Sequence, residues 1–155
     1  MAKELIELQV NGRRHELAVA PNETLLDVLR ETLRLTGTKC ACDDSSCGSC
    51  TVVVDGKPML SCVMLAASYQ DSVIQTIESL ATAGELDALQ RGFVLEGGSQ
   101  CGFCTPGMVM ALHTLLEKSK DPSEDDVRAA ISGNICRCTG YMQICRAVRY
   151  AVQHV

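Results

Sequence analysis

The cysteines are the residues of this chain most able to do chemistry, and there are ten of them among 155 residues. Three stand close together at Cys42, Cys47 and Cys50, and Cys62 follows a predicted strand. The C-x4-C-x2-C spacing with a distant fourth cysteine is that of plant-type [2Fe–2S] sites. A tight loop can supply three thiolates while its backbone wraps around the sulfurs, and Gly48 leaves room for such an approach. The spacing therefore predicts a [2Fe–2S] cluster held by these four cysteines.

Four more cysteines form a second set in the C-terminal half. Cys101 and Cys104 are separated by two residues, and Cys136 and Cys138 by Arg137 alone. A disulfide between neighbours as close as Cys136 and Cys138 would be strained, and their spacing does not suit most zinc sites. Together the two pairs can supply four thiolates, so we predict a second [2Fe–2S] cluster here.

Zinc sites or scattered core cysteines are the alternative interpretation of these eight residues. Zinc usually takes paired C-x2-C knuckles, so spacing and compartment together favour iron–sulfur chemistry. Two cysteines remain. Cys145 lies at helical spacing with Val148 and is expected to be a buried, inert thiol. Cys40 could replace Cys42 as a ligand, but its spacing to Cys47 departs from the ferredoxin pattern, and we expect it to be a spectator.

Composition narrows the class of protein. The start, "MAKELIELQV", carries Lys3, Glu4 and Glu7 where a signal peptide would be apolar, and no segment is apolar enough to span a membrane. We therefore expect a cytoplasmic protein, in which metal binding or redox chemistry outranks disulfide formation. A formal charge of −5, 3% aromatic residues and no tryptophan argue against a nucleic-acid partner.

The N-terminal half reads as strands around one helix. Ile6, Leu8 and Val10 alternate before an "NG" turn at 11–12, and a return strand follows. "NETLLDVLRETLRL" then has helical periodicity, with Thr24 as its cap and Gly37 as its end. "TVVVDGKPML" predicts two strands joined at "DG" (55–56), and "SVIQTI" predicts a last strand. This order indicates a small mixed sheet with a helix packed across it.

The C-terminal half has the pattern of four helices. The first has Leu86, Leu89, Phe93 and Val94 on one face and ends at 97–98. The expected caps of the others are at the ends of short loops: Thr105 followed by Pro106, Ser123 with Asp126 in a helix that stops near Gly133, and Thr139.

A faint internal repeat links two of these helices. "CTPGMVMAL" from Cys104 and "CTGYMQICRAV" from Cys138 share a Cys-Thr helix start. Two helical hairpins facing each other would bring both cysteine pairs to one point, beside helix N-termini that favour anionic sulfur. We predict a two-fold four-helix arrangement with four thiolates at its focus.

Three segments carry a resemblance to a known family: "LTGTKCACDDSSCGSCTVVVDG", "QCGFCTPGMVMAL" and "GNICRCTGYMQI". With the segments between them, the chain resembles the small iron–sulfur subunit of molybdenum hydroxylases, the xanthine dehydrogenase and aldehyde oxidoreductase group. The resemblance implies an α+β fold. Residues 1–76 would form a β-grasp, plant-type ferredoxin-like domain, and residues 77–155 a helical [2Fe–2S] domain.

The resemblance also implies partners and a role. The helical-domain cluster would lie next to the molybdopterin cofactor of a large subunit, and the ferredoxin-type cluster toward FAD in a medium subunit, in a heterotrimer. Electrons would pass through both clusters between molybdenum and FAD. Gln100 would hydrogen-bond the pterin, whereas without the resemblance a loop glutamine bonded to local backbone is an equal interpretation. The large subunit would choose the substrate, from N-heterocycles, purines and aldehydes to carbon monoxide and aryl-CoA thioesters.

The chain departs from the family pattern at Ala41 and Ser45, where glycines are usual around the first ligand. A side chain at 45 is expected to affect loop conformation and cluster potential, while the ligand spacing survives. Two other functions stay open. A free-standing two-cluster redox carrier or iron–sulfur sensor would bind its partners only transiently, and a zinc-stapled interaction module would be colourless.

Overall fold

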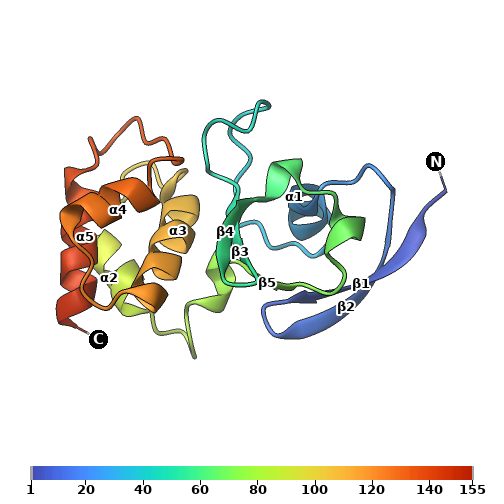
Figure 1. The fold of residues 1–155 in the computed structure, drawn as a ribbon, viewed down its shortest axis with the longest axis horizontal. Helices are drawn as coiled ribbons and strands as arrows, with labels where there is room; N and C mark the ends of the chain where they lie inside the picture. Colours follow the sequence, from blue (N-terminus) through green and yellow to red (C-terminus); the bar gives the residue numbers. More distant parts are fainter. Residues whose placement is uncertain (1, 155) are drawn as a thin grey trace.

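The computed structural model describes residues 2–154 and consists of a sheet half and a helical half (Figure 1). The elements, in chain order, are β1 (Glu4–Val10), β2 (Arg13–Val19), α1 (Leu25–Asp27), β3 (Thr51–Val54), β4 (Lys57–Leu60), β5 (Val73–Gln75), α2 (Ala88–Leu95), α3 (Thr105–Lys118), α4 (Glu124–Ala130) and α5 (Met142–Gln153). The order of strands and helices confirms the α+β class, with the β-grasp half first and the helical half second.

The five strands form one mixed sheet in the order β2-β1-β5-β3-β4. β1 pairs with β2 antiparallel and with β5 parallel, and β3 lies antiparallel to both β4 and β5. Both predicted hairpin turns are present. Asn11–Gly12 and Asp55–Gly56 each place two successive residues at positive φ, which matches the right-handed twist of the strands that they join.

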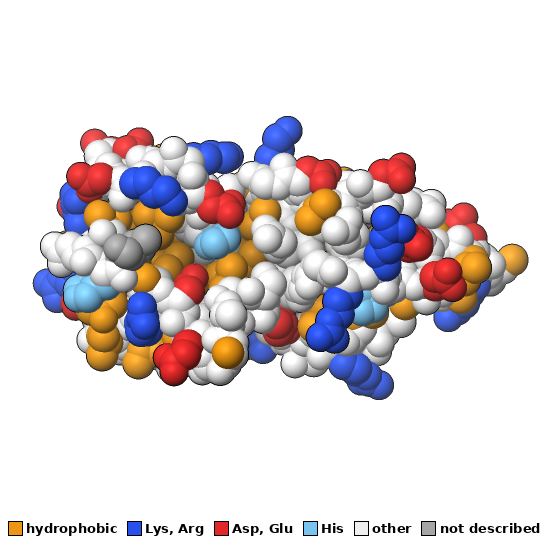
Figure 2. All heavy atoms as spheres, turned by 90° about the horizontal axis from the view of Figure 1, so that it is seen from below, with side chains coloured by type: hydrophobic (Ala, Val, Ile, Leu, Met, Phe, Trp, Pro, Cys, Tyr) orange, Lys and Arg blue, Asp and Glu red, His pale blue; other side chains and the backbone are white. Residues whose placement is uncertain are grey.

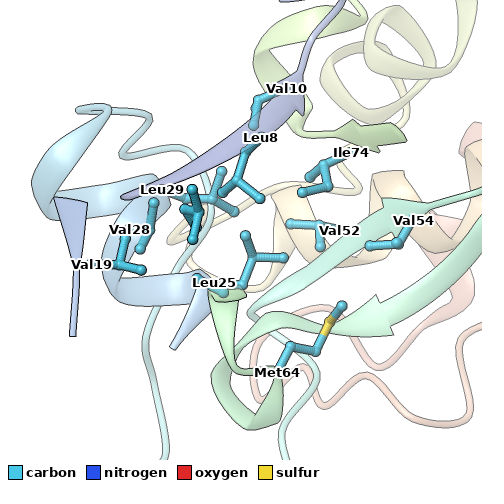
Figure 3. Packing of buried hydrophobic residues seen from close by; sticks show 12 residues of the cluster. Leu8, Val10, Val19, Leu25, Val28, Leu29, Val52, Val54, Met64 and Ile74 are labelled. Carbon is cyan, nitrogen blue, oxygen red and sulfur yellow. The ribbon is translucent and has the colours of Figure 1, made fainter. Parts of the chain in front are cut away.

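α1 and the π-type turn that continues it over Val28–Thr32 pack on one face of the sheet (Figure 3). The capping box predicted for Thr24 and Asp27 is present, since each side chain accepts the other residue's backbone N–H. The core of this half is formed by Ile6, Leu8, Val10, Val19, Leu25, Val28, Leu29, Val52, Val54, Met64, Ala66 and Ile74. Both faces of β3 are buried, because α3 packs against the face that this core does not use.

The four helices of the second half enclose a separate core that includes Leu89, Phe93, Met108, Leu112, Ile144 and Val148. α2 packs along α5, and α3 packs along α4. In Figure 1, α3 is the helix nearest to β3 and β4, and the contacts between these elements join the two halves. The cysteine loop between α1 and β3 extends from the sheet beside this junction.

Four details of the predicted helices were wrong. The first helix ends at Thr32, and Arg34 rather than Gly37 takes the left-handed conformation after it. Gly37 instead allows close contact with Ile77, whose Cγ2 would lie 2.3 Å from an added Cβ. Thr105 is the first residue of α3, and Cys104 holds the cap position.

The third error is that Thr139 does not cap α5, because Tyr141 holds that position with φ of 70°. The fourth concerns the face of α2. In α2, Leu89 and Phe93 are buried as expected, but Val94 is 66% exposed and Leu86 precedes the helix and is 42% exposed. Only part of the apolar face predicted for this helix is therefore buried in the core.

No helix in the described part of the chain combines the length and apolar character needed to cross a bilayer. Figure 2 shows acidic and basic side chains interspersed on one face of the molecule, with hydrophobic side chains gathered mainly over the helical end. This surface carries no large region of one charge sign in that view.

Candidate metal centres

The N-terminal cysteine set lies on a loop that is fixed at both ends. The Arg30 guanidinium donates hydrogen bonds to the carbonyls of Thr36 and Thr38, at 3.1 and 2.6 Å. At the base of the loop, the Lys39 N–H donates to the carbonyl of Ser49 (3.3 Å). These bonds close the loop that carries Cys42 and Cys47 and bring it back to the sheet at Cys50.

Cys62 reaches this loop because the end of β4 is bonded to Cys50. The backbone N–H and hydroxyl of Ser61 both donate to the Cys50 carbonyl, at 3.3 and 2.8 Å. The sulfurs of Cys50 and Cys62 are consequently 3.3 Å apart. Burial, followed by the neighbouring Cys50 and Cys42, raises the pKa of the Cys62 thiol to about 12.

Cys42 and Cys47 form the other pair of this set. A hydrogen bond between their side chains lowers the pKa of Cys42 below its ordinary value. Since Cys42 also acts on Cys62 through its charge, the structure brings all four predicted cysteines of the first set to one site. Cys50 is buried and the other three are partly buried.

The helical set gathers in the same way from two separate loops. The sulfurs of Cys101 and Cys138 are 3.6 Å apart, although the residues are 37 positions apart in the sequence. Cys104 lies against Cys136, and burial followed by the neighbouring thiols of Cys136 and Cys101 raises the pKa of Cys104 to about 12. The two hairpins therefore meet at the four predicted cysteines, and Cys101 and Cys138 lie at the surface.

Each set consists of two close pairs. Within residues 2–154, no three Cys, His, Asp or Glu side chains converge closely enough to hold a single metal ion. Two thiolates on one tetrahedral metal lie about 3.8 Å apart, since metal–sulfur bonds are about 2.3 Å long. The Cys50–Cys62 and Cys101–Cys138 separations are close to this value. Two pairs per set fit two bridged irons better than one zinc.

The pKa shifts of the cysteines also fit an iron–sulfur cluster at each set. The pKa values of Cys62 and Cys104 are raised because burial and nearby sulfurs oppose a second negative charge. A bound cationic iron centre would compensate that repulsion, so that all four thiols of a set could bind it as thiolates. The donor set, all thiolate and partly shielded from water, is the one that iron–sulfur clusters take in proteins.

Thr139 and Tyr141 were missed as site residues. The Thr139 hydroxyl and backbone N–H lie 3.1 and 3.4 Å from the Cys136 sulfur, toward which both donate. Burial alone would raise the pKa of Cys136, but the bonds from Thr139 outweigh it and hold the pKa below its usual value. The Tyr141 hydroxyl accepts from the Cys136 N–H (2.9 Å). The only sequence signal was a threonine after the last cysteine, which we assigned to a helix cap.

The expectation that helix N-termini would face both cysteine pairs was half right. Cys104 is at the N-terminus of α3, but Thr139, Gly140 and Tyr141 separate Cys138 from α5. The donors toward Cys136 therefore come from this intervening loop rather than from the first turn of the helix.

The two cysteine sets are joined through the backbone. The N–H of Ile135 donates to the carbonyl of Cys47, with nitrogen and oxygen 2.9 Å apart. Cys47 belongs to the first set, and Ile135 directly precedes Cys136 of the second. One hydrogen bond and the residue Ile135 thus connect the main chains of the predicted ligands Cys47 and Cys136.

The remaining predicted residues lie as follows. Cys145 is buried in the helical core, as expected, and its role as an inert thiol stays a prediction. Cys40 is exposed, and its sulfur is 3.9 Å from the Cys42 carbonyl. Ser45 has φ of 60°, a left-handed conformation that favours glycine. Glycine is the residue that the family pattern usually has here. Gln100 is exposed in the loop just before Cys101.

Two family models cover nearly the whole chain. Residues 8–81 match the 2Fe-2S iron-sulfur cluster binding domain, and residues 76–149 match the [2Fe-2S] binding domain. The two matches follow each other in the order of the sheet half and the helical half.

Relatives along the whole length give the same result. The nicotinate dehydrogenase small FeS subunit of Eubacterium barkeri is 45% identical over 99% of this chain and 98% of its own. The nicotine 6-hydroxylase small subunit of Paenarthrobacter nicotinovorans is 46% identical, and the match covers 92% of this chain and 86% of that subunit.

Among solved structures, a chain of quinoline 2-oxidoreductase from Pseudomonas putida 86 superposes with a TM-score of 0.94. It is 42% identical, and the match covers 98% of this chain and 94% of that one. Two cysteine sets in paired geometry, two matching cluster-binding domains and these full-length relatives all point the same way. The chain belongs to the family of small iron–sulfur subunits of molybdenum hydroxylases, the xanthine dehydrogenase and aldehyde oxidoreductase group.

Proposed function

We propose that the chain is the electron-transfer subunit of a multi-subunit molybdenum hydroxylase and binds two [2Fe–2S] clusters. The proposed ligands are Cys42, Cys47, Cys50 and Cys62 for one cluster, and Cys101, Cys104, Cys136 and Cys138 for the other. When bound, such clusters supply one-electron transfer at potentials set by their surroundings. The chain's own residues hold them, shield them and fix the distance between them.

The paired geometry supports a specific sharing of ligands. In the first set, Cys42 and Cys47 would share one iron, and Cys50 and Cys62 the other. In the second set, the same reasoning pairs residues across the two hairpins: Cys101 with Cys138, and Cys104 with Cys136. Each helical-domain iron would then bridge the two hairpins, so that cluster binding and hairpin docking stabilise each other.

The hydrogen bond from Ile135 to Cys47 is the observation that carries the proposal. A relay needs its two centres to be close and well connected, and here the ligand Cys47 and the residue before the ligand Cys136 are in direct contact. A module that used its metals only as staples would have no need to join the two sites in this way.

The surface around the second site supports a permanent partner. Cys101 and Cys138 are exposed, and Phe103 between two of the ligands is 46% exposed. The nearby C-terminal end of α2 adds Val94 and Leu95, which are 66% and 63% exposed. An obligate subunit would cover such residues, so we favour it over the alternative of a free-standing carrier.

We propose that the covering partner is a large molybdopterin-binding subunit, and that a medium FAD-binding subunit docks nearer to the first site. Both relatives described above are named as small subunits, which suits such a complex. Gln100, exposed next to Cys101, is positioned to hydrogen-bond a pterin in that interface. Gln100→Ala should then weaken molybdopterin retention in the complex while both iron–sulfur signals persist.

We further propose a domain boundary between residues 76 and 77. The first hydrophobic core draws its buried residues from positions 6–74, and Ile77 and Leu80 pack against the second. A cytoplasmic location is also proposed, since none of the ten cysteines is joined to another in a disulfide.

The test is anaerobic purification of the native complex. Four iron and four acid-labile sulfide per copy of this chain, two distinct electron paramagnetic resonance (EPR) signals after reduction, and co-purifying chains with molybdenum and flavin would support the proposal. A colourless chain with bound zinc, or a brown chain that purifies alone, would overturn it in favour of the zinc module or the free carrier.

A further inference from the structure

Asn134 joins the two cysteine loops through its side chain. Its amide nitrogen donates to the carbonyl of Gly48 at 2.8 Å and lies 3.3 Å from the Thr51 hydroxyl. Asn134 is 5% exposed, and the Gly48 contact spans 86 positions of the sequence. A buried amide that bonds across two domains in this way contributes to how they dock, because leaving its partners unmet is costly.

The position of this contact makes it specific to the two proposed centres. Gly48 follows Cys47 directly, and Asn134 stands two residues before Cys136. The backbone bond from Ile135 to Cys47 lies beside the amide contact, so two hydrogen bonds hold the same short stretch of each loop together.

The loop that carries Cys136 is braced around the same asparagine. The Tyr141 hydroxyl donates to the Asn134 carbonyl at 3.3 Å and accepts from the Cys136 N–H at 2.9 Å. Any shift of Asn134 relative to Gly48 would therefore move the backbone of Cys136 as well.

The backbone around Gly48 is closely packed against both neighbouring segments. A Cβ at Gly48 would lie 2.2 Å from the carbonyl oxygen of Gly133, and one at Gly107 would lie 2.3 Å from the carbonyl oxygen of Gly48. α3 and the Asn134 loop thus both approach the Gly48 backbone as closely as glycine allows. The separation of the two cysteine sets is set here, by contact, rather than by a flexible linker.

We propose that Asn134 is a positioning residue: its amide clamp on Gly48 fixes the separation of the two clusters and so sets the rate of electron exchange between them. The proposal rests on the proposed function, since it needs both clusters to be bound. It goes further by assigning that rate to a side chain that is not a cluster ligand.

The experiment uses the native complex with Asn134→Ala, Asn134→Asp or Thr114→Val. Asn134→Asp keeps the shape but turns an acceptor toward the Gly48 carbonyl. Thr114→Val is the matched control, because it removes a buried hydrogen bond within α3, from the Thr114 hydroxyl to the Met110 carbonyl (3.0 Å), and leaves the bonds between Asn134 and Gly48 in place. Iron and sulfide contents are measured first for every variant.

Two readouts then report on the clamp. With dithionite as reductant, the magnetic coupling between the reduced clusters is read from the splitting of their EPR signals. The rate of electron equilibration between them is measured after rapid partial reduction. We expect both Asn134 variants to keep four iron per chain, to lose the splitting of the EPR signals and to equilibrate more slowly than the wild type, because losing this buried hydrogen bond loosens the contact that holds the two sites at one separation. Thr114→Val should match the wild type.

Gly107→Ala tests the same contact without touching Asn134. It adds one methyl group in a helix, where alanine is ordinarily favoured, yet this methyl group would press on the Gly48 carbonyl. Gly133→Ala is its control, since nothing lies within 4 Å of a Cβ at that position. We expect Gly107→Ala to lose the splitting of the EPR signals, as the Asn134 variants do. Gly133→Ala should keep the splitting of the wild type.

Unchanged splitting and unchanged exchange rate in Asn134→Ala, with both clusters present, would overturn the proposal. Equal slowing in Asn134→Ala and Thr114→Val would overturn it too, because the effect would then reflect lost stability. These failures differ from a failure of the proposed function, which would already appear as missing iron or a missing EPR signal in the wild-type complex.

Discussion

The hydroxyl of Thr139 donates a hydrogen bond to the sulfur of Cys136 across 3.1 Å, and the Thr139 N–H adds a second donor at 3.4 Å. Hydrogen bonds to a ligand sulfur stabilise its negative charge, and this stabilisation is greatest in the reduced, more negative cluster. Thr139 is thus expected to change the electronic properties of the proposed centre without being a ligand.

Replacing Thr139 by valine should therefore lower the reduction potential of the helical-domain cluster and leave the other cluster unchanged. The measurement is a redox titration in which the two EPR signals are followed separately. Thr139→Ser keeps the hydroxyl and should titrate close to the wild type. Equal potentials in the valine and wild-type proteins would show that the hydroxyl does not act on the cluster.

Local sequence patterns predicted those parts of the fold that depend on neighbouring residues. The Asn11–Gly12 turn and the Ser123–Asp126 capping box are present because each is decided within four residues. The cysteine spacings belong to the same class, since C-x4-C-x2-C limits how a loop can fold around a metal group.

The errors arose where a residue has a second possible partner, or where its partner lies far away in the sequence. Thr139 has the chemistry of a helix cap, but the Cys136 sulfur takes its hydroxyl hydrogen bond. Asn134 gave no signal, because its partner Gly48 lies far away in the sequence. Val94 fits the helical pattern yet is exposed, which no single-chain argument about core packing could anticipate.

Cys138→Ser should damage the helical-domain cluster and uncouple substrate oxidation from the external acceptor. The sulfur of Cys138 is paired with that of Cys101, and a serine hydroxyl is a poor substitute for a thiolate on iron. The measurement is EPR of the reduced complex together with turnover. Cys145→Ser is the matched control because Cys145 is buried in the helical core, and both signals should survive. Full turnover with two unchanged signals in Cys138→Ser would contradict the assignment.

Acid should weaken the helical half partly through Asp126. Hydrogen bonds from Ser123 hold the pKa of Asp126 below its ordinary value. A carboxylate whose pKa is lowered by folding stabilises the protein above its unfolded pKa, and this stabilisation is lost as the pH falls through the folded pKa. Asp126→Asn should therefore make the thermal unfolding temperature less sensitive to pH below about 4.

Asp125→Asn serves as its control, because it removes the same charge from the same helix turn while the Ser123–Asp126 box stays intact. If both variants flattened the pH dependence equally, general charge near the N-terminus of α4 would explain the effect. A difference between them isolates the capping box.

The choice between Cys40 and Cys42 can be decided by a matched pair of serine variants. Cys47 lowers the pKa of the Cys42 thiol and the charge of Cys42 raises the pKa of Cys62, whereas Cys40 is exposed with its sulfur near a backbone carbonyl. Cys42→Ser should abolish the EPR signal of the N-terminal cluster and lower the iron content toward two per chain, since the remaining set lacks one of four thiolates. Cys40→Ser should retain four iron per chain and both signals. The reverse result would mean that the loop rearranges when the cluster binds and that Cys40 is the ligand.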